Sequence, residues 1–180
     1  MAGNVVLVPL LCTQCKSPVA AQAGEIAWAC PQCQQGLLLD ETKGLLPFSI
    51  NYSAQIPAGA VGMPYWVAAG SVQLSRKVYG FGNNENDSLR FWSETKRFFV
   101  PAYACPLDKL LDIGPRLVLQ PPVLQPGPAA RFAPITTALA DVQPLVDFIV
   151  MGIETSRKDK LKELYLKVNL GAPALWILPA

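Results

Sequence analysis

The sequence LLCTQCKSPVAAQAGEIAWACPQCQQG, residues 10–36, determines how the first part of this chain folds. It contains two C-x-x-C pairs, Cys12 with Cys15 and Cys30 with Cys33, and fourteen residues separate the pairs. A C-x-x-C turn directs two thiolates toward one point, and two such turns complete a tetrahedron around a metal ion. We therefore expect the four cysteines to bind one metal ion per chain, and zinc is the metal that this ligand set favours.

The segment between the two pairs has the pattern of a β-hairpin. Gly24 lies at the expected turn, and on the return strand Ile26 and Trp28 alternate with alanines, which is the period of two typical of a strand. A hairpin returns the chain to its start, so it brings the second cysteine pair back to the first.

Residues 8–38 resemble a zinc ribbon of the four-cysteine type. The resemblance implies a structural zinc ion, but ribbons occur in transcription factors, ribosomal proteins, enzymes and scaffolds alike, so it does not indicate a function. Many ribbons have glycine directly after each cysteine pair, whereas this chain has Lys16 and Gln34 there.

Two alternatives to zinc remain for the four cysteines. One is a pair of disulfides, which the expected cytoplasmic setting disfavours. The other is a redox iron site, because CPQC (30–33) is similar to the second cysteine pair of rubredoxins, whose pairs are usually further apart. With four protein ligands, a zinc ion would lack the open position that catalysis uses.

The composition restricts the chemistry of the chain. It has 180 residues, 51% hydrophobic and 16% charged, with a net charge of +2 and no histidine. Without histidine, Ser-His-Asp and Cys-His catalysis and mixed cysteine–histidine metal sites are excluded in cis. Cys105 precedes a predicted helix, and we interpret it as an inert cysteine rather than a nucleophile. We therefore expect a protein that is not an enzyme.

The fold class that we expect is α+β. A zinc ribbon (1–43) is predicted to precede a mainly antiparallel β domain (44–180) with one short helix and one longer C-terminal helix. The short helix is predicted to begin at Pro106 and to end at Gly114, with Pro115 preventing its continuation. The other expected segments are a polar loop at 80–88, a strand at 116–119, a proline-rich loop at about 120–134, a helix at 141–160 and two C-terminal strands.

Two long segments carry no charged side chain, residues 44–75 and 168–180. They are either strands buried on both faces or apolar surfaces docked on a partner protein. Prolines and glycines exclude a membrane helix from the first segment, and no convincing secretion signal is present. Our first hypothesis is therefore a cytoplasmic, non-catalytic zinc-binding structural or adaptor protein, an accessory subunit of a larger protein assembly.

A second hypothesis is a nucleic-acid-binding regulator. Arg90 and Arg97 are interleaved with aromatic residues, a pattern that suits a platform for single strands but is also typical of a sheet with one wet and one dry face. The interleaved rings are Phe91, Trp92, Phe98 and Phe99. The expected ribbon carries two basic and three acidic side chains, which disfavours phosphate binding there.

Overall fold

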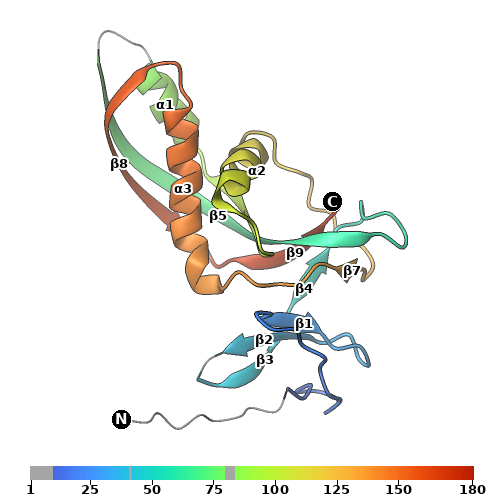
Figure 1. Cartoon of the computed structure of the whole chain (residues 1–180). Coiled ribbons are helices and arrows are strands. Elements are labelled where there is room, and N and C mark those ends of the chain that lie inside the picture. The colour runs from blue at the N-terminus through green and yellow to red at the C-terminus, as the bar shows by residue number, and fades with distance from the viewer. Residues whose placement is uncertain (1–9, 41, 80–83) are drawn as a thin grey trace, which may run out of the picture.

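The computed structural model describes residues 10–40, 42–79 and 84–180, and it has an α+β architecture (Figure 1). A small three-stranded sheet follows the first cysteine pair and carries the second pair in the connection between its first two strands, and a larger six-stranded sheet forms most of the remainder. Helices pack on the larger sheet, whereas the small sheet lies beside one end of it (Figure 1).

The small sheet is antiparallel in the order β1-β2-β3, with β1 at Ala27–Ala29, β2 at Gly36–Asp40 and β3 at Gly44–Phe48. Trp28 pairs with Leu37 across β1 and β2, and both side chains are buried. The return strand therefore forms where the alternation of apolar residues predicted it, but the hairpin predicted between the cysteine pairs does not form, because residues 19–21 are not a strand and β1 pairs with β2 instead. β3 continues this sheet beyond residue 43.

The larger sheet is built around one long strand, β5. The order is β4-β9-β5-β6, and β7 and β8 also pair with β5. All pairs are antiparallel except β4 with β9 and β5 with β7. The strands are β4 (Ile50–Tyr52), β5 (Val61–Tyr79), β6 (Lys96–Pro101), β7 (Arg131–Phe132), β8 (Lys160–Leu170) and β9 (Ala174–Leu178).

The second half of β5 pairs with β8, from Gly70 opposite Leu170 to Tyr79 opposite Lys160, and only Gly70 of this stretch also pairs with β6. We call this pair of strands the arm. Its register shifts between Lys77 and Val78, where β8 contributes an extra residue. Figure 1 shows the arm curving away from the rest of the sheet, with α1 and α3 on the same side of it.

The described residues form three α-helices, α1 (Asn84–Trp92), α2 (Leu107–Leu119) and α3 (Val142–Thr155), and a 3₁₀ turn at Leu139–Asp141 precedes α3. α3 supplies much of the main core, because its apolar side chains at three- and four-residue spacing face the sheet. They are Val142, Val146, Ile149, Val150 and Ile153. Among the described residues, no helix has the length and apolar character needed to cross a membrane.

Several predicted elements are wrong. Part of the polar loop predicted at 80–88 is helical, because α1 begins at Asn84; residues 80–83 lie outside the described residues. α2 does not end at Gly114 but continues to Leu119, so residues 116–119 form no strand. A Cβ at Gly114 would lie 2.5 Å from Ile149 on α3, so this glycine allows two helices to approach rather than ending one.

α3 is shorter than predicted and ends at Thr155. The hydroxyl of Thr155 donates to the carbonyl of Met151 at 2.8 Å, and the hydroxyl of Ser156 donates to that of Ile153 at 2.8 Å. These bonds occupy carbonyls that the end of a helix leaves without backbone partners. The charged residues that follow, up to Lys160, lead into β8.

The two uncharged segments mostly form strands of the two sheets. Residues 44–75 contribute β3, β4 and most of β5, and residues 168–180 contribute the end of β8 and β9. Trp66, Leu175 and Ile177 from these strands are fully buried in the main core. Burial inside the fold therefore accounts for much of the missing charge.

Candidate metal centre

The four cysteine sulfurs converge on one point. All four Sγ atoms lie within 4.8 Å of one another, with 3.6 Å between Cys12 and Cys33 and 3.5 Å between Cys15 and Cys30. A tetrahedral zinc ion with Zn–S bonds of about 2.3 Å requires sulfurs about 3.8 Å apart, so the spacing fits such an ion. All four are free thiols, far from the S–S bond length of about 2.0 Å.

The two C-x-x-C turns have the same backbone structure. In each turn the first cysteine accepts a hydrogen bond from the amide four residues later and donates one to the carbonyl five residues later. The distances are 3.0 Å for Lys16 N to Cys12 O, 2.9 Å for Cys12 N to Ser17 O, 2.9 Å for Gln34 N to Cys30 O and 2.8 Å for Cys30 N to Gln35 O. The site is therefore built from two equivalent turns.

The residues after each pair adopt the conformation for which glycine is usually selected. Lys16 and Gln34 both have φ of 62°, and among the described residues they are the only non-glycine positions with positive φ. This left-handed region is uncommon for residues with a Cβ. The departure from glycine in the sequence thus leaves the geometry of the turns intact.

A small apolar cluster supports the site. Trp28 packs with Val19 and Leu37 against Cys12 and Cys30, and all five are buried. The indole Nε1 of Trp28 donates to a carboxylate oxygen of Glu25 at 2.8 Å, and the same oxygen accepts the amide of Gln22 at 2.7 Å. Trp28 is therefore a packing residue, whose ring is not free to stack on a ligand.

The pKa values of the thiols differ because each sulfur responds to its neighbours. The hydroxyl and amide of Ser17 lower the pKa of Cys15 to about 6. The amide of Cys15 is the main cause that lowers the pKa of Cys12. The amide of Gln35 lowers the pKa of Cys33, but burial and the hydrogen bonds of the other three thiols outweigh it and raise this pKa to about 12. Crowded sulfurs of this kind favour a cation at their centre.

The small sheet is attached to the larger part of the molecule through Ile135. The amide of Ile26 donates to the carbonyl of Ile135 at 2.8 Å, and Ile135 is fully buried in the main core. A hollow of about 490 Å³ lies at this junction, lined by residues that include Trp28, Tyr52 and Arg131. The metal centre is thus joined to the main domain by a backbone contact.

Cys105 lies apart from this cluster, at the start of α2. Burial is the main cause that raises its pKa, and the charge of Asp108 adds to the effect. A raised pKa opposes formation of the thiolate, which is the nucleophilic form of cysteine.

The aromatic platform suggested by the sequence around Arg90 and Arg97 does not form. Both arginines are exposed, but Trp92 is 4% exposed and Phe98 and Phe99 are fully buried. The alternation of arginines and aromatic residues instead reflects one solvent-exposed face and one buried face, as the alternative interpretation of the sequence predicted.

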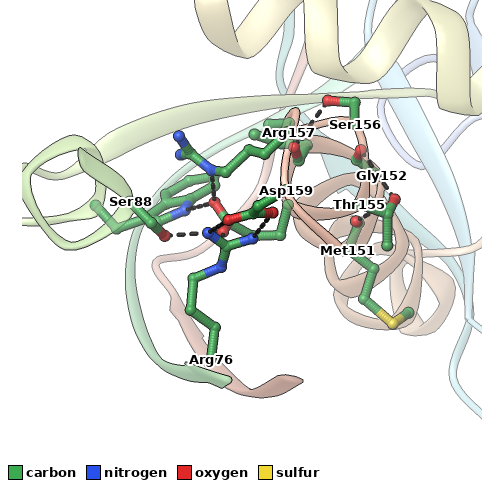
Figure 2. Close-up of polar contacts among 11 residues, drawn as sticks. Arg76, Ser88, Met151, Gly152, Thr155, Ser156, Arg157 and Asp159 are labelled. Carbon is green, nitrogen blue, oxygen red and sulfur yellow. Dashed lines mark hydrogen bonds and ion pairs between the residues drawn. The ribbon is translucent and has the colours of Figure 1, made fainter. Parts of the chain in front are cut away.

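Figure 2 shows a buried charge network that the sequence did not predict. Arg76 on β5 forms two hydrogen bonds with the carboxylate of Asp159, at 2.6 and 2.8 Å. Its Nε lies 3.2 Å from an oxygen of Glu154 on α3, an ion-pair distance without hydrogen-bond geometry. The hydrogen bonds to Asp159 are the first cause that raises the pKa of Arg76. Arg76 therefore stays charged inside the molecule.

Glu154 joins several elements to one another. Its carboxylate accepts hydrogen bonds from Ser88 at 2.8 Å and Trp92 at 2.8 Å, both on α1, and from Arg157 at 2.9 Å. The positive charges of two arginines thus balance the negative charges of two carboxylates. Because its hydrogen bonds and ion pairs connect these elements, we assign the network a structural role in holding α1, α3 and the arm together. The inward-facing position of Arg76 on a strand was the only signal of it in the sequence.

The chain matches no known family model, no curated protein and no solved structure.

Proposed function

We propose that this chain is a non-catalytic zinc-binding structural or adaptor protein, an accessory subunit that docks on a larger protein assembly. One observation carries the proposal, the convergence of four protein thiols on one point. Such a set fills all four positions of a tetrahedral zinc ion and leaves none for a substrate or a reactive water. Zinc would hold residues 10–48 as a four-cysteine ribbon.

The need for a metal follows from the size of the apolar cluster. Of its five buried residues, Cys12 and Cys30 would themselves be ligands, which leaves Val19, Trp28 and Leu37. A segment this short buries too little apolar surface to fold alone, so metal-binding energy would serve as its folding energy. The chain's own contribution is the pair of left-handed turns and the Glu25 contact that orients Trp28.

The docking surface that we propose lies on α2 and α3. Leu107 and Leu111, one turn apart on α2, are 49% and 38% exposed, and Phe148 on the adjacent α3 is 41% exposed. Exposed large apolar side chains on neighbouring elements are typical of protein interfaces. The partner is therefore expected to be a protein with an apolar surface.

Elemental analysis of protein purified without added metal tests the metal assignment. We expect one zinc per chain, and protection of Cys12, Cys15, Cys30 and Cys33 from alkylation until a chelator is added. Cys105 is the internal control, because its alkylation rate should not depend on the chelator. One iron per chain would instead support the rubredoxin-like alternative, and Cys12→Ser with unchanged metal content would refute the site.

Native affinity purification with mass spectrometry tests the docking surface. We expect a stoichiometric protein partner that is lost in the double variant Leu111→Ser with Phe148→Ser. The matched control is Lys109→Ser with Asp112→Ser, which changes two exposed polar residues on α2. A strictly monomeric protein by light scattering, with no partner recovered by the unaltered chain, would contradict the proposal.

A further inference from the structure

The two faces of the arm differ in chemistry. One face packs toward α1 and α3 and carries core side chains such as Val72 and Val168. The opposite face, which we call the outer face, is covered by no element of the described chain in Figure 1. Its exposed residues are Ser71, Gln73, Ser75, Lys77, Tyr79, Lys160, Lys162, Tyr165, Lys167 and Asn169.

Two aromatic rings stand exposed on the outer face. Tyr79 is 64% exposed and Tyr165 is 68% exposed, whereas aromatic residues elsewhere in the core, such as Trp66 and Phe98, are fully buried. Tyr165 lies opposite Ser75, four residues from Tyr79 along β5. The two rings are therefore spaced about 13 Å apart along the strand direction. The pairing of β5 with β8 places them on the same face of the arm.

Positive charge concentrates around the same two rings. The arm and the segment 157–159 before β8 carry seven basic and two acidic side chains, whereas the other residues carry eight basic and eleven acidic ones. Arg76 and Arg157 are neutralised by Glu154 and Asp159. Four exposed lysines of the outer face then accompany one glutamate, Glu163, which pairs with Lys77 at 2.7 Å, and a fifth exposed lysine, Lys158, lies in the segment before β8. The lysines are Lys77, Lys158, Lys160, Lys162 and Lys167.

The remaining side chains of the outer face are small and polar. Ser71, Gln73, Ser75 and Asn169 offer hydrogen-bond donors and acceptors without covering the rings. A shallow hollow of about 270 Å³ lies between Gln73, Ser75, Tyr165 and Lys167. Large exposed aliphatic side chains, which an apolar protein interface needs, are missing from this face.

We propose that the outer face of the arm binds single-stranded nucleic acid. The lysines supply attraction for the phosphates, and Tyr79 and Tyr165 supply flat faces on which unpaired bases stack. Stacking needs no base-specific hydrogen bond, so binding tolerates different sequences. The Lys162 ammonium, 5.7 Å from the centre of the Tyr79 ring, places a cation beside one stacking position. This site is separate from the metal centre and independent of the proposed docking surface.

Fluorescence anisotropy with labelled dT20 and rU20 at 50 mM salt tests the proposal. We expect both probes to bind the full-length, metal-replete protein. Tyr165→Ala should weaken binding about 5- to 160-fold, the range for loss of one stacked base, whereas Tyr165→Phe should retain it. Val123→Ala, which shortens an exposed apolar side chain outside the arm, should leave the affinity unchanged.

The salt dependence tests the charge. Replacing Lys162 and Lys167 by glutamine should lower the slope of log affinity against log salt by about 0.7 for each lysine. The control pair Lys43→Gln and Lys109→Gln makes the same charge change elsewhere and should leave the slope unaltered. Absence of binding at 50 mM salt would overturn the proposal. It would also be overturned if polyglutamate of equal charge bound as tightly as dT20 and competed fully with it, because an acidic protein would then fit the face equally well.

Discussion

Arg76 and Lys77 are neighbours on β5 that face opposite sides of the arm. The side chain of Arg76 is fully buried in its ion pairs, whereas that of Lys77 is 64% exposed in its pair with Glu163. Buried charges lose their hydration, so they depend on their partners, whereas water screens an exposed pair. The two positions therefore allow a direct comparison at the scale of one residue.

We predict that Arg76→Met lowers the free energy of unfolding by about 3–5 kcal/mol, because Asp159 loses both hydrogen bonds from the guanidinium and the buried Glu154 keeps Arg157 but loses Arg76. Lys77→Met should lower it by less than about 1 kcal/mol. Urea unfolding followed by tryptophan fluorescence measures both. Equal losses in the two variants would show that the buried network contributes no more than a surface pair.

Predictability differs between the two polar sites at this scale. The ligands of the metal centre were predictable because the C-x-x-C spacing is local and each turn positions its own two sulfurs. The network of Arg76 was not, because Arg76 and Asp159 are 83 residues apart and only the completed fold brings them together. The left-handed conformations of Lys16 and Gln34 were also not predictable, since neither residue type indicates positive φ.

At the scale of elements, the contact between α2 and α3 depends on two glycines with different surroundings. A Cβ at Gly114 would lie 2.5 Å from Cγ1 of the buried Ile149, but one at Gly152 would lie 3.3 Å from Cδ2 of Leu111. Leu111 is 38% exposed, so its methyl group has room to move. The same substitution should therefore have opposite effects at the two positions.

Gly114→Ala should lower the free energy of unfolding by about 1–3 kcal/mol, the usual cost of overpacking a core. Gly152→Ala should raise it by up to about 1 kcal/mol, because alanine favours the helix over glycine. Thermal and urea unfolding of the two variants provide the measurement. A Gly114→Ala variant as stable as Gly152→Ala would mean that the helices separate without cost.

The elements with strong periodicity were predicted correctly, and those that depend on tertiary contacts were not. β8 and β9 follow the alternation of apolar residues in the sequence, and the main stripe of α3 follows helical spacing. The dipeptide Gly114-Pro115 is typical of the end of a helix. In the fold, Gly114 instead packs against Ile149, and α2 stays helical beyond both residues. α1 was not predicted, because it begins in a polar stretch of sequence. The contacts that anchor it are hydrogen bonds from Ser88 and Trp92 to Glu154, on a helix that is distant in the sequence.

At the scale of the whole molecule, the two sheets share part of the main core, which includes Ala27 of β1 and contacts Phe48 of β3, but they differ in what else stabilises them. The small sheet surrounds a four-thiol centre and a cluster of five buried residues, whereas the larger sheet has an extensive core. If zinc occupies the centre, its removal should act on one part of the chain only.

Amide hydrogen exchange with and without a chelator tests this division. We expect the amides of β1, β2 and β3 to lose protection when zinc is removed, because binding and folding are coupled there. The amides of β5, β8 and α3 should retain theirs. If all these elements lost protection together, the two sheets would form one cooperative unit. The expected outcome places β3 with the metal-binding part, so it would move the boundary predicted at residue 43 to after residue 48.

The position of β9 has a consequence for the order of events during synthesis. β4 and β5 follow one another along the chain, yet β9 lies between them, and Asn51 on β4 bonds the carbonyl of Leu175, 124 residues later. While the chain emerges from the ribosome, the edges of β4 and β5 that later pair with β9 therefore remain unpaired. Unpaired strand edges are prone to misassociation. Contacts of such separation slow folding. A nascent chain of this protein would be a natural client for chaperones until β9 enters the sheet.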